Sequence, residues 1–96
     1  MARVEGFEWD DAKERANLRK HGFAFSDAMR LFASSEVIED IDDRFDYGEE
    51  RLIAFGRVRQ TVVCCVYTWR RTRRRIISLR KADAEEIQRY QEAIAS

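Results

Sequence analysis

Four short runs of β-branched and aromatic residues follow one another in the second half of the chain, and they constrain the fold most. They read EVIEDI (36–41), RLIAFGRV (51–58), TVVCCVYTW (61–69) and RRIISLRK (74–81). Each run has the length and composition of a strand, and acidic or arginine-rich connections separate them. Neighbouring strands joined by short connections pair antiparallel, so the sequence predicts an antiparallel meander of three or four strands.

Helical patterns lie on both sides of these runs. Residues 10–22 begin with Asp10 or Asp11 as the N-cap and end on a basic turn followed by Gly22, which is typical of a helix. Residues 25–34 carry apolar side chains at helical spacing, with Ser26 as a candidate cap. A short stretch before them, 3–9, alternates weakly and is a strand candidate.

The end of the chain, 83–95, has the clearest helix signal. Asp83 and Glu86 have the spacing of a capping box, and Ile87, Tyr90 and Ile94 form one apolar stripe. We expect this helix to pack on the sheet. The predicted fold class is therefore α+β, with N-terminal helices and a C-terminal helix on an antiparallel sheet.

The length of 96 residues suits one domain, 1–96, with one modest core. No run of about 18 apolar residues and no secretory signal are present, so we expect no membrane span and a cytoplasmic location. Cys64 and Cys65 are neighbours in a predicted strand and point to opposite faces, where they do not suit a mutual disulfide. We expect them to be reduced core residues.

Charge is segregated along the chain although 18 basic and 18 acidic residues cancel. Residues 57–81 contain 9 bases and no acid, whereas residues 1–56 contain 14 acids and 8 bases. A basic block that also forms strands is displayed on a folded face, where it attracts an anion such as RNA or an acidic partner. The acidic run EDIDDRFDYGEE (39–50) is mainly solvated charge, with contact to a basic partner as the alternative.

Six arginines lie between Tyr67 and Arg80. A four-residue loop, 71–74, would place Arg70 opposite Arg75, and like charges opposite each other on a sheet are destabilising unless an anion lies between them. Arginine has the planar, multi-donor shape that suits phosphate. The pattern favours anion binding, with a solvated loop that discourages edge pairing as the alternative.

His21 is the only histidine and the only side chain whose unperturbed pKa suits proton transfer near neutrality. Its other interpretation is a helix C-terminal residue that complements the helix dipole. One histidine and two adjacent cysteines cannot complete a zinc site, so we expect no metal centre and no cofactor. No glycine-rich phosphate loop is present.

Several motifs in one order resemble the BrnT family of bacterial toxins. They are FEWDDAK, NLRKHG, GEERLIAFG, VYTWR and RRIISLRKA, followed by Glu86 and Tyr90. The resemblance extends from Phe7 to Tyr90. It implies a RelE-like fold, metal-independent endoribonuclease activity and neutralisation by a BrnA antitoxin, in a complex that binds DNA through the antitoxin.

The family's pattern falls on Trp9, Asp10, Lys13, Asn17, Lys20, His21, Gly22, Phe25, Phe32, Gly48, Glu49, Arg51, Gly56, Thr68, Arg70, Arg75, Ile76, Ser78, Arg80 and Ala82. Ser34-Ser35 stands where the family usually has Asp-Pro, and the loop before the last strand is richer in arginine. The resemblance therefore does not single out one functional arginine among residues 70–75.

Metal-independent RNA cleavage uses the 2′-hydroxyl as nucleophile and needs a proton acceptor, a proton donor and cations. We assign His21 as the leading proton-transfer group, Glu49 as a second candidate base, and Arg51, Arg70 and Arg80 as clamps on the phosphate. The residues predicted to bind RNA are Lys20, Tyr67, Trp69, Arg71, Arg73, Arg74, Arg75 and Ser78.

Two alternatives stay open: a module that binds RNA or an acidic protein without cleavage, and a subunit that docks an antitoxin through its arginine strand. We expect an RNA substrate and a BrnA-like antitoxin, the latter in a heterotetramer with the toxin, as partners.

Overall fold

A computed structural model describes residues 1–44 and 46–96 of the chain; Phe45 of the acidic run lies outside them. In these residues three helices accompany a six-stranded mixed sheet with the order β1-β2-β6-β5-β4-β3. The α+β class is confirmed. The expected three or four strands are too few, because the N-terminal segment adds two more.

The predicted meander is present as four consecutive antiparallel strands. They are β3 (Ile38–Asp42), β4 (Arg51–Val58), β5 (Thr61–Arg70) and β6 (Arg73–Lys81). β5 is buried from Val62 to Thr68, which explains why its sequence is a continuous apolar run rather than an alternating one. It is the central strand of the meander.

The strand candidate at 3–9 is divided into β1 (Ala2–Val4) and β2 (Phe7–Trp9) by a turn in which Gly6 has φ +78°. A positive φ of this kind is accessible to glycine without steric cost. β2 then pairs parallel with the start of β6, Phe7 opposite Arg74 and Glu8 opposite Arg75. This parallel pairing makes the sheet mixed and brings the N-terminus to the β5–β6 hairpin.

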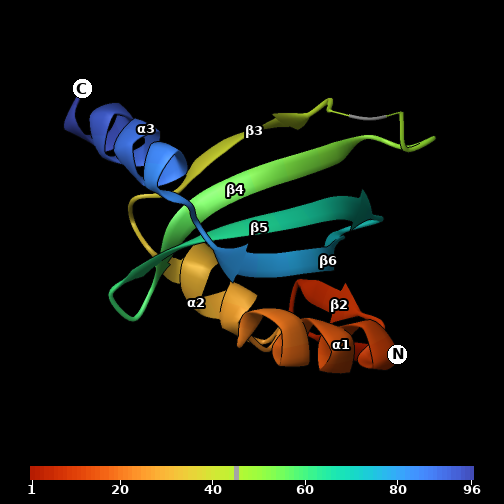
Figure 1. Cartoon of the computed structure of the whole chain (residues 1–96). Coiled ribbons are helices and arrows are strands. Elements are labelled where there is room, and N and C mark those ends of the chain that lie inside the picture. Colours follow the sequence, from red (N-terminus) through yellow and green to blue (C-terminus); the bar gives the residue numbers. More distant parts are fainter. Residues whose placement is uncertain (45) are drawn as a thin grey trace.

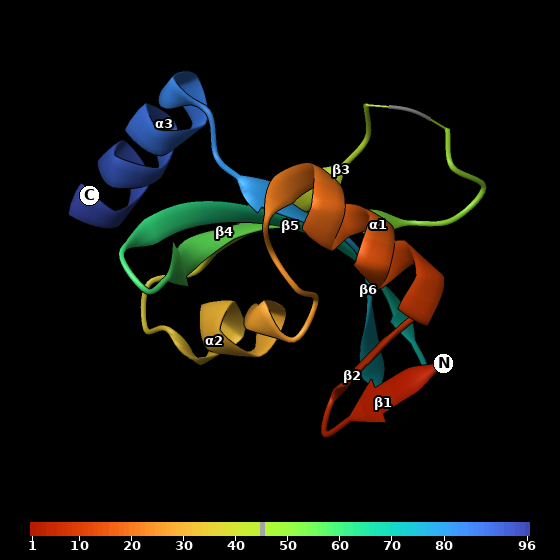
Figure 2. The same ribbon diagram turned by 60° about the horizontal axis from the view of Figure 1, so that its bottom comes forward.

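The helices cover the two faces of the sheet unequally (Figures 1 and 2). α1 (Asp11–His21) lies against β6 and α2 (Asp27–Ala33) against β4, whereas α3 (Ala84–Ala95) packs at one end of the other face. We call the face covered by α2 the first face and the face that α3 partly covers the second face. The second face is open toward the hairpin.

Local signals define the helix ends as the sequence predicts. Asp10 caps α1, its carboxylate accepting the N–H of Lys13, and Gly22 ends it with φ +79°. The Asp83–Glu86 capping box of α3 is complete. Ser26 stands at the N-cap of α2 but makes no side-chain cap hydrogen bond; there the sequence prediction is right in position and wrong in mechanism.

Two contacts attach the helices to the sheet. Asn17 of α1 donates to the carbonyl of Leu79 (2.8 Å) and accepts its N–H (3.2 Å), which satisfies the β6 backbone beyond the short β2. Gly56 of β4 lies against Leu31 of α2 so closely that a Cβ there would be 3.0 Å from the Leu31 Cγ. The first contact fixes α1 relative to β6, the strand that carries most of the arginines, and the second fixes α2 relative to β4.

Each face of the sheet has its own hydrophobic core. Phe25, Leu31, Val63, Cys65 and Leu79 belong to the main core on the first face, and Val62, Ala82 and Tyr90 form a smaller one under α3. Cys64 and Cys65 are buried and unpaired, as expected. Burial raises the pKa of the Cys64 thiol to about 11. Among the described residues, no helix combines the length and apolar composition needed to cross a bilayer.

Candidate functional site

The β5–β6 hairpin is tighter than the charge argument predicts. Arg70 pairs with Arg73, so the loop consists of Arg71 and Thr72 alone, and the predicted four-residue loop with Arg70 opposite Arg75 is wrong. Arg71 adopts φ +56° to close this turn. Two-residue hairpin loops match the twist of the strands, and this preference outweighs the repulsion between the paired arginines.

A hollow of about 320 Å³ lies beside this hairpin and is lined by Met1, Arg3, Glu8, Arg70, Arg71 and Arg73. We call it the hairpin hollow. Four of its six residues are arginines, and its one carboxylate, Glu8, already pairs with Arg75 at 3.0 Å. Arg73 contributes a buried Nε with no hydrogen-bond partner. The hollow is therefore concave and cationic, with a donor left over for an anion.

Strand register explains how residues far apart in sequence line this hollow. Arg3 lies opposite Glu8, Glu8 opposite Arg75, and Arg75 opposite Thr68, so the four form one row across the second face. Arg70 and Arg73 form the next row toward the hairpin. The sequence analysis missed Arg3 and Glu8, because only the non-local pairing of β2 with β6 brings them to the arginine block.

Glu49 lies between two of the predicted arginines. Its carboxylate is 3.6 Å from the Nε of Arg51 and 3.7 Å from an Nη of Arg70. Arg51 also stacks over the ring of Tyr47, with its guanidinium carbon 4.0 Å from the centroid. The structure thus brings three of the five predicted catalytic residues together at the hairpin end of the sheet.

Arg74 lies on the opposite face from the other hairpin arginines. Its guanidinium carbon is 4.1 Å from the ring centroid of Phe32 and 4.6 Å from that of Trp69. Tyr67 is 1% exposed and donates to the Glu39 carboxylate, and its burial raises its pKa to about 12. Trp69 is 45% exposed. The predicted aromatic residues thus surround an arginine on the first face, and only Trp69 presents its ring to solvent.

A second group of predicted residues lies at the other end of β6. Arg80 donates two hydrogen bonds to Glu86 of α3, at 2.8 and 2.9 Å. Burial, together with the positive charges of Lys20 and Arg80, lowers the pKa of His21 below its usual 6.5. The lowered pKa of His21 favours the neutral imidazole, the form that accepts a proton.

Ser78 lies between the two groups. The register shifts between Val66 and Tyr67, which leaves Ile77 as an extra residue in β6. Ser78 consequently pairs with Val66 and lies on the second face, whereas the predicted register, with Arg70 opposite Arg75, would have placed it opposite Tyr67 on the first face. The second face of β6 thus carries Arg73, Arg75, Ser78 and Arg80 in sequence.

The predicted catalytic residues do not form one cluster. Arg80 is opposite Cys64, and Arg70 is six residues further along β5, a distance of about 20 Å at 3.3 Å per residue. Glu49, Arg51 and Arg70 lie at the hairpin end, whereas His21, Lys20 and Arg80 lie at the α3 end. Within the described residues, no three His, Cys, Asp or Glu side chains are arranged to hold a metal ion.

Comparison with known proteins gives one family. Residues 9–86 match the family described as “Ribonuclease toxin, BrnT, of type II toxin-antitoxin system”. The match covers most of the chain and includes both groups of candidate residues. A search of curated proteins found no match.

Proposed function

The chain belongs to the BrnT family of type II toxin–antitoxin ribonuclease toxins, and we propose that it is a metal-independent endoribonuclease neutralised by a BrnA-like antitoxin. The observation that carries the proposal is the hairpin hollow, where Arg3, Arg70, Arg71 and Arg73 surround a carboxylate that is already paired. A concave surface with this charge selects phosphate. RNA supplies phosphates along its length.

We assign the hairpin hollow to RNA backbone binding. Arg70 is exposed and can turn from its 3.7 Å ion pair with Glu49 toward a phosphate oxygen, and the buried Nε of Arg73 has no hydrogen-bond partner to lose. Arg75 is 16% exposed and held by Glu8, so it contributes charge and holds β2 in place. Ser78 lies on the same face of β6, between Arg75 and Arg80.

We assign His21 as the proton-transfer group. Because its pKa lies below its usual value, the neutral imidazole is ready to take the proton of the 2′-hydroxyl, and Arg80 next to it offsets the negative charge of the phosphorane. Glu49 pairs with Arg70, and about 20 Å of β5 separates Arg70 from the residue opposite Arg80, so we do not assign Glu49 to the same phosphate as His21. RNA that spans β6 would place one phosphate in the hollow and the scissile phosphate at His21.

Trp69 is the candidate platform for a base. Its exposed ring continues the stack formed by Phe32 and the Arg74 guanidinium, and stacking on such a ring is favourable for every base. Trp9, the other tryptophan, is 5% exposed. Quenching of tryptophan fluorescence by RNA therefore reports on Trp69, and Trp69→Phe removes the signal while it preserves a stacking ring.

The test incubates the protein with single-stranded RNA in the presence of EDTA. We expect cleavage that falls roughly 10²- to 10⁴-fold in His21→Gln and that Glu49→Gln leaves nearly intact. Arg70→Ala/Arg73→Ala should weaken binding and reduce its salt dependence. Arg15→Ala/Arg19→Ala, which removes two exposed arginines of α1, is the matched control. Intact RNA that is bound with a steep salt dependence would show a binding module instead of a nuclease.

We further propose that the domain is a RelE-like fold extended by β1 and β2, that the toxin acts in the cytoplasm, and that the antitoxin complex is a heterotetramer that contacts DNA only through the antitoxin. Light scattering on the co-expressed complex measures its stoichiometry. DNA binding by the isolated toxin would contradict the last assignment.

A further inference from the structure

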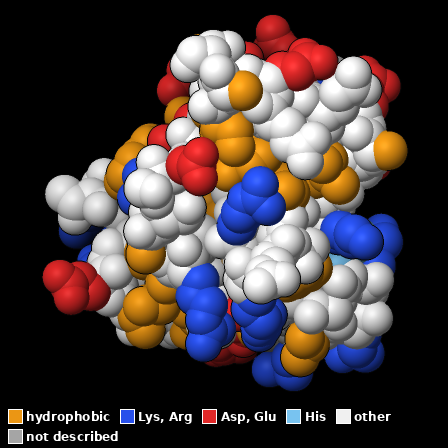
Figure 3. All heavy atoms as spheres, turned by 90° about the vertical axis from the view of Figure 1, so that its left-hand side faces the viewer, with side chains coloured by type: hydrophobic (Ala, Val, Ile, Leu, Met, Phe, Trp, Pro, Cys, Tyr) orange, Lys and Arg blue, Asp and Glu red, His pale blue; other side chains and the backbone are white. Residues whose placement is uncertain are grey.

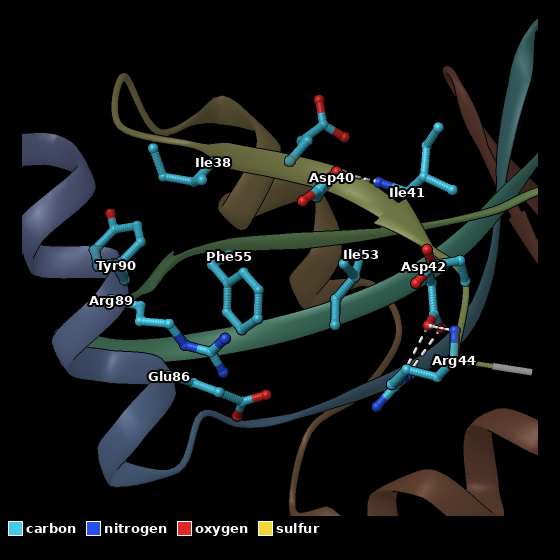
Figure 4. A pocket seen from close by; sticks show the side chains of 12 residues that line it. Ile38, Asp40, Ile41, Asp42, Arg44, Ile53, Phe55, Glu86, Arg89 and Tyr90 are labelled. Atoms are coloured by element: carbon cyan, nitrogen blue, oxygen red, sulfur yellow. Dashed lines mark hydrogen bonds and ion pairs between the residues drawn. The ribbon is translucent and has the colours of Figure 1, made fainter.

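The second face carries a groove of opposite character along its β3 edge, from α3 to the residues that follow β3. It has a volume of about 270 Å³ and lies between β3, β4 and α3 (Figure 4). Its apolar wall is formed by Ile38, Ile53, Phe55 and Tyr90. Five carboxylates and two guanidinium groups also line it, namely those of Glu39, Asp40, Asp42, Asp43, Glu86, Arg44 and Arg89. We call it the acidic groove.

Not all of these charges are available to a ligand. Asp42 is held by Arg44 at 2.7 Å, and this contact lowers the pKa of Asp42. Glu86 is held by Arg80. Among the described residues, Asp40 and Asp43 have no cationic partner, and both are exposed. The rim of the groove therefore presents two uncompensated carboxylates beside an apolar wall.

The free edge of the sheet forms one border of the groove. β3 is the last strand in the sheet order, and the side chain of Ile41 is 56% exposed there. The Asp40 carboxylate accepts the N–H of Ile41 at 2.8 Å, so a backbone donor of this edge already has a partner. This arrangement disfavours the addition of another strand and leaves side-chain insertion as the way to occupy the groove.

RNA does not fit this surface, because its phosphates would approach Asp40 and Asp43. A segment that inserts an apolar side chain against Phe55 and places lysine or arginine at the rim fits both features. Seen from the α3 end, acidic atoms gather at the top of the molecule and most basic atoms lie in its lower half (Figure 3). The carboxylates of Asp40 and Asp43 attract a basic segment to the groove, whereas the four arginines that line the hairpin hollow repel it.

We propose that the acidic groove is the docking site for a basic, amphipathic segment of the antitoxin. The inference rests on the proposed function only in naming the partner, because the groove itself defines the chemistry of the segment. It gives the acidic run of the sequence a role that RNA cleavage does not provide.

The test measures binding of the antitoxin encoded beside the toxin gene. In the toxin, Asp40→Lys/Asp43→Lys reverses the two exposed rim charges, and Glu5→Lys/Glu92→Lys makes the same change in net charge at exposed positions outside the groove lining. We expect the rim variant to bind roughly tenfold more weakly at low salt, with the difference shrinking as salt is added. The control variant should bind as the wild type does. Equal affinity of the rim and control variants, or no binding by the wild type, overturns the proposal.

RNA cleavage by the free toxin is measured in parallel, and it separates this inference from the proposed function. We expect the rim variant to cleave RNA like the wild type and to resist the antitoxin. Sedimentation of the free toxin tests the other occupant, a second copy of the chain. A wild-type dimer that the rim variant dissociates would assign the groove to self-association and overturn the proposal.

Discussion

Substitution of Arg80 by alanine should destabilise the fold as well as affect any catalysis. Its guanidinium holds Glu86, whose side chain is 10% exposed, while that of Arg80 is 28% exposed. Glu86 also accepts the N–H of Asp83 in the capping box. Without Arg80, a nearly buried carboxylate at the start of α3 loses its counter-ion.

The magnitude follows from the burial of the pair. Loss of one partner from a buried ion pair costs about 3–5 kcal/mol, whereas an exposed pair contributes about 0–1 kcal/mol. The pair lies between these limits, so we expect Arg80→Ala to lower the free energy of unfolding by about 2 kcal/mol. For 96 residues this corresponds to a fall in Tm of about 10 °C.

Thermal unfolding of the wild type, Arg80→Ala, Glu86→Gln and the double variant measures the coupling. The pKa of Glu86 is lowered from 4.5, mainly by its hydrogen bonds to Arg80. A lowered pKa in the folded state contributes stability above pH 4.5 that is lost as the pH falls through the folded value. The difference between the wild type and Arg80→Ala should therefore shrink at acid pH. A Tm of Arg80→Ala within about 2 °C of the wild type at pH 7 would refute this reasoning.

The same variants separate positioning from catalysis. Glu86→Gln keeps the guanidinium but weakens its anchor, so it tests whether a held Arg80 is needed. Cleavage has to be compared well below the lowest Tm of the set. Activity lost in Arg80→Ala and retained in Glu86→Gln would identify a direct contact with RNA.

Three further changes test other parts of the structure. If His21 is the base, kcat/KM should rise with pH through a pKa below 6.5 and then level off, and His21→Gln should lose this dependence; an unchanged profile would exclude the assignment. Arg71 has φ +56°, a conformation that costs an L-residue roughly 1–2 kcal/mol but that glycine adopts freely. Urea unfolding of Arg71→Gly should therefore show a free energy of unfolding about 1 kcal/mol higher than that of the wild type, while RNA titration shows weaker binding. Gly56→Ala places a Cβ 3.0 Å from Leu31 and should cost about 1–3 kcal/mol by overpacking; equal urea midpoints for variant and wild type would contradict the close contact.

Local signals explain what the sequence predicted well. A capping carboxylate, a C-terminal glycine and the Asp83–Glu86 box act within one turn of backbone, so their residues suffice to place the ends of α1 and the start of α3. The meander also follows from neighbouring runs. β1 and β2 were not separated, because strands of three residues are too short to show an alternating period, and the partner of β2 lies more than sixty residues away.

The hairpin shows why the site was harder to predict than the fold. Side chains in a strand alternate between faces, so a bulge transfers every residue beyond it to the other face. The extra residue Ile77 is not encoded in the spacing of the arginines. As a result, Ser78 and Arg80 lie on the same face as Arg73 and Arg75, instead of on the face of Arg74 and the aromatic rings.

The two proposed sites lie toward opposite edges of one sheet face, the acidic groove along β3 and the hairpin hollow beside β1, β2 and β6. Asp40 is opposite Ile53 and Asp42 opposite Arg51, so the rim of the groove extends toward the hairpin, and β4 and β5 lie between the two sites. Three strand spacings of about 4.8 Å separate β3 from β6, which is about 14 Å, so a basic segment in the groove does not by itself cover the hollow. About four further residues in an extended conformation reach that far, and there the arginines favour acidic side chains. Under the proposed docking, an inhibitor that is basic where it meets β3 and acidic where it meets the hairpin would match both sites in one direction only, and its acidic part would lie where RNA phosphates would bind.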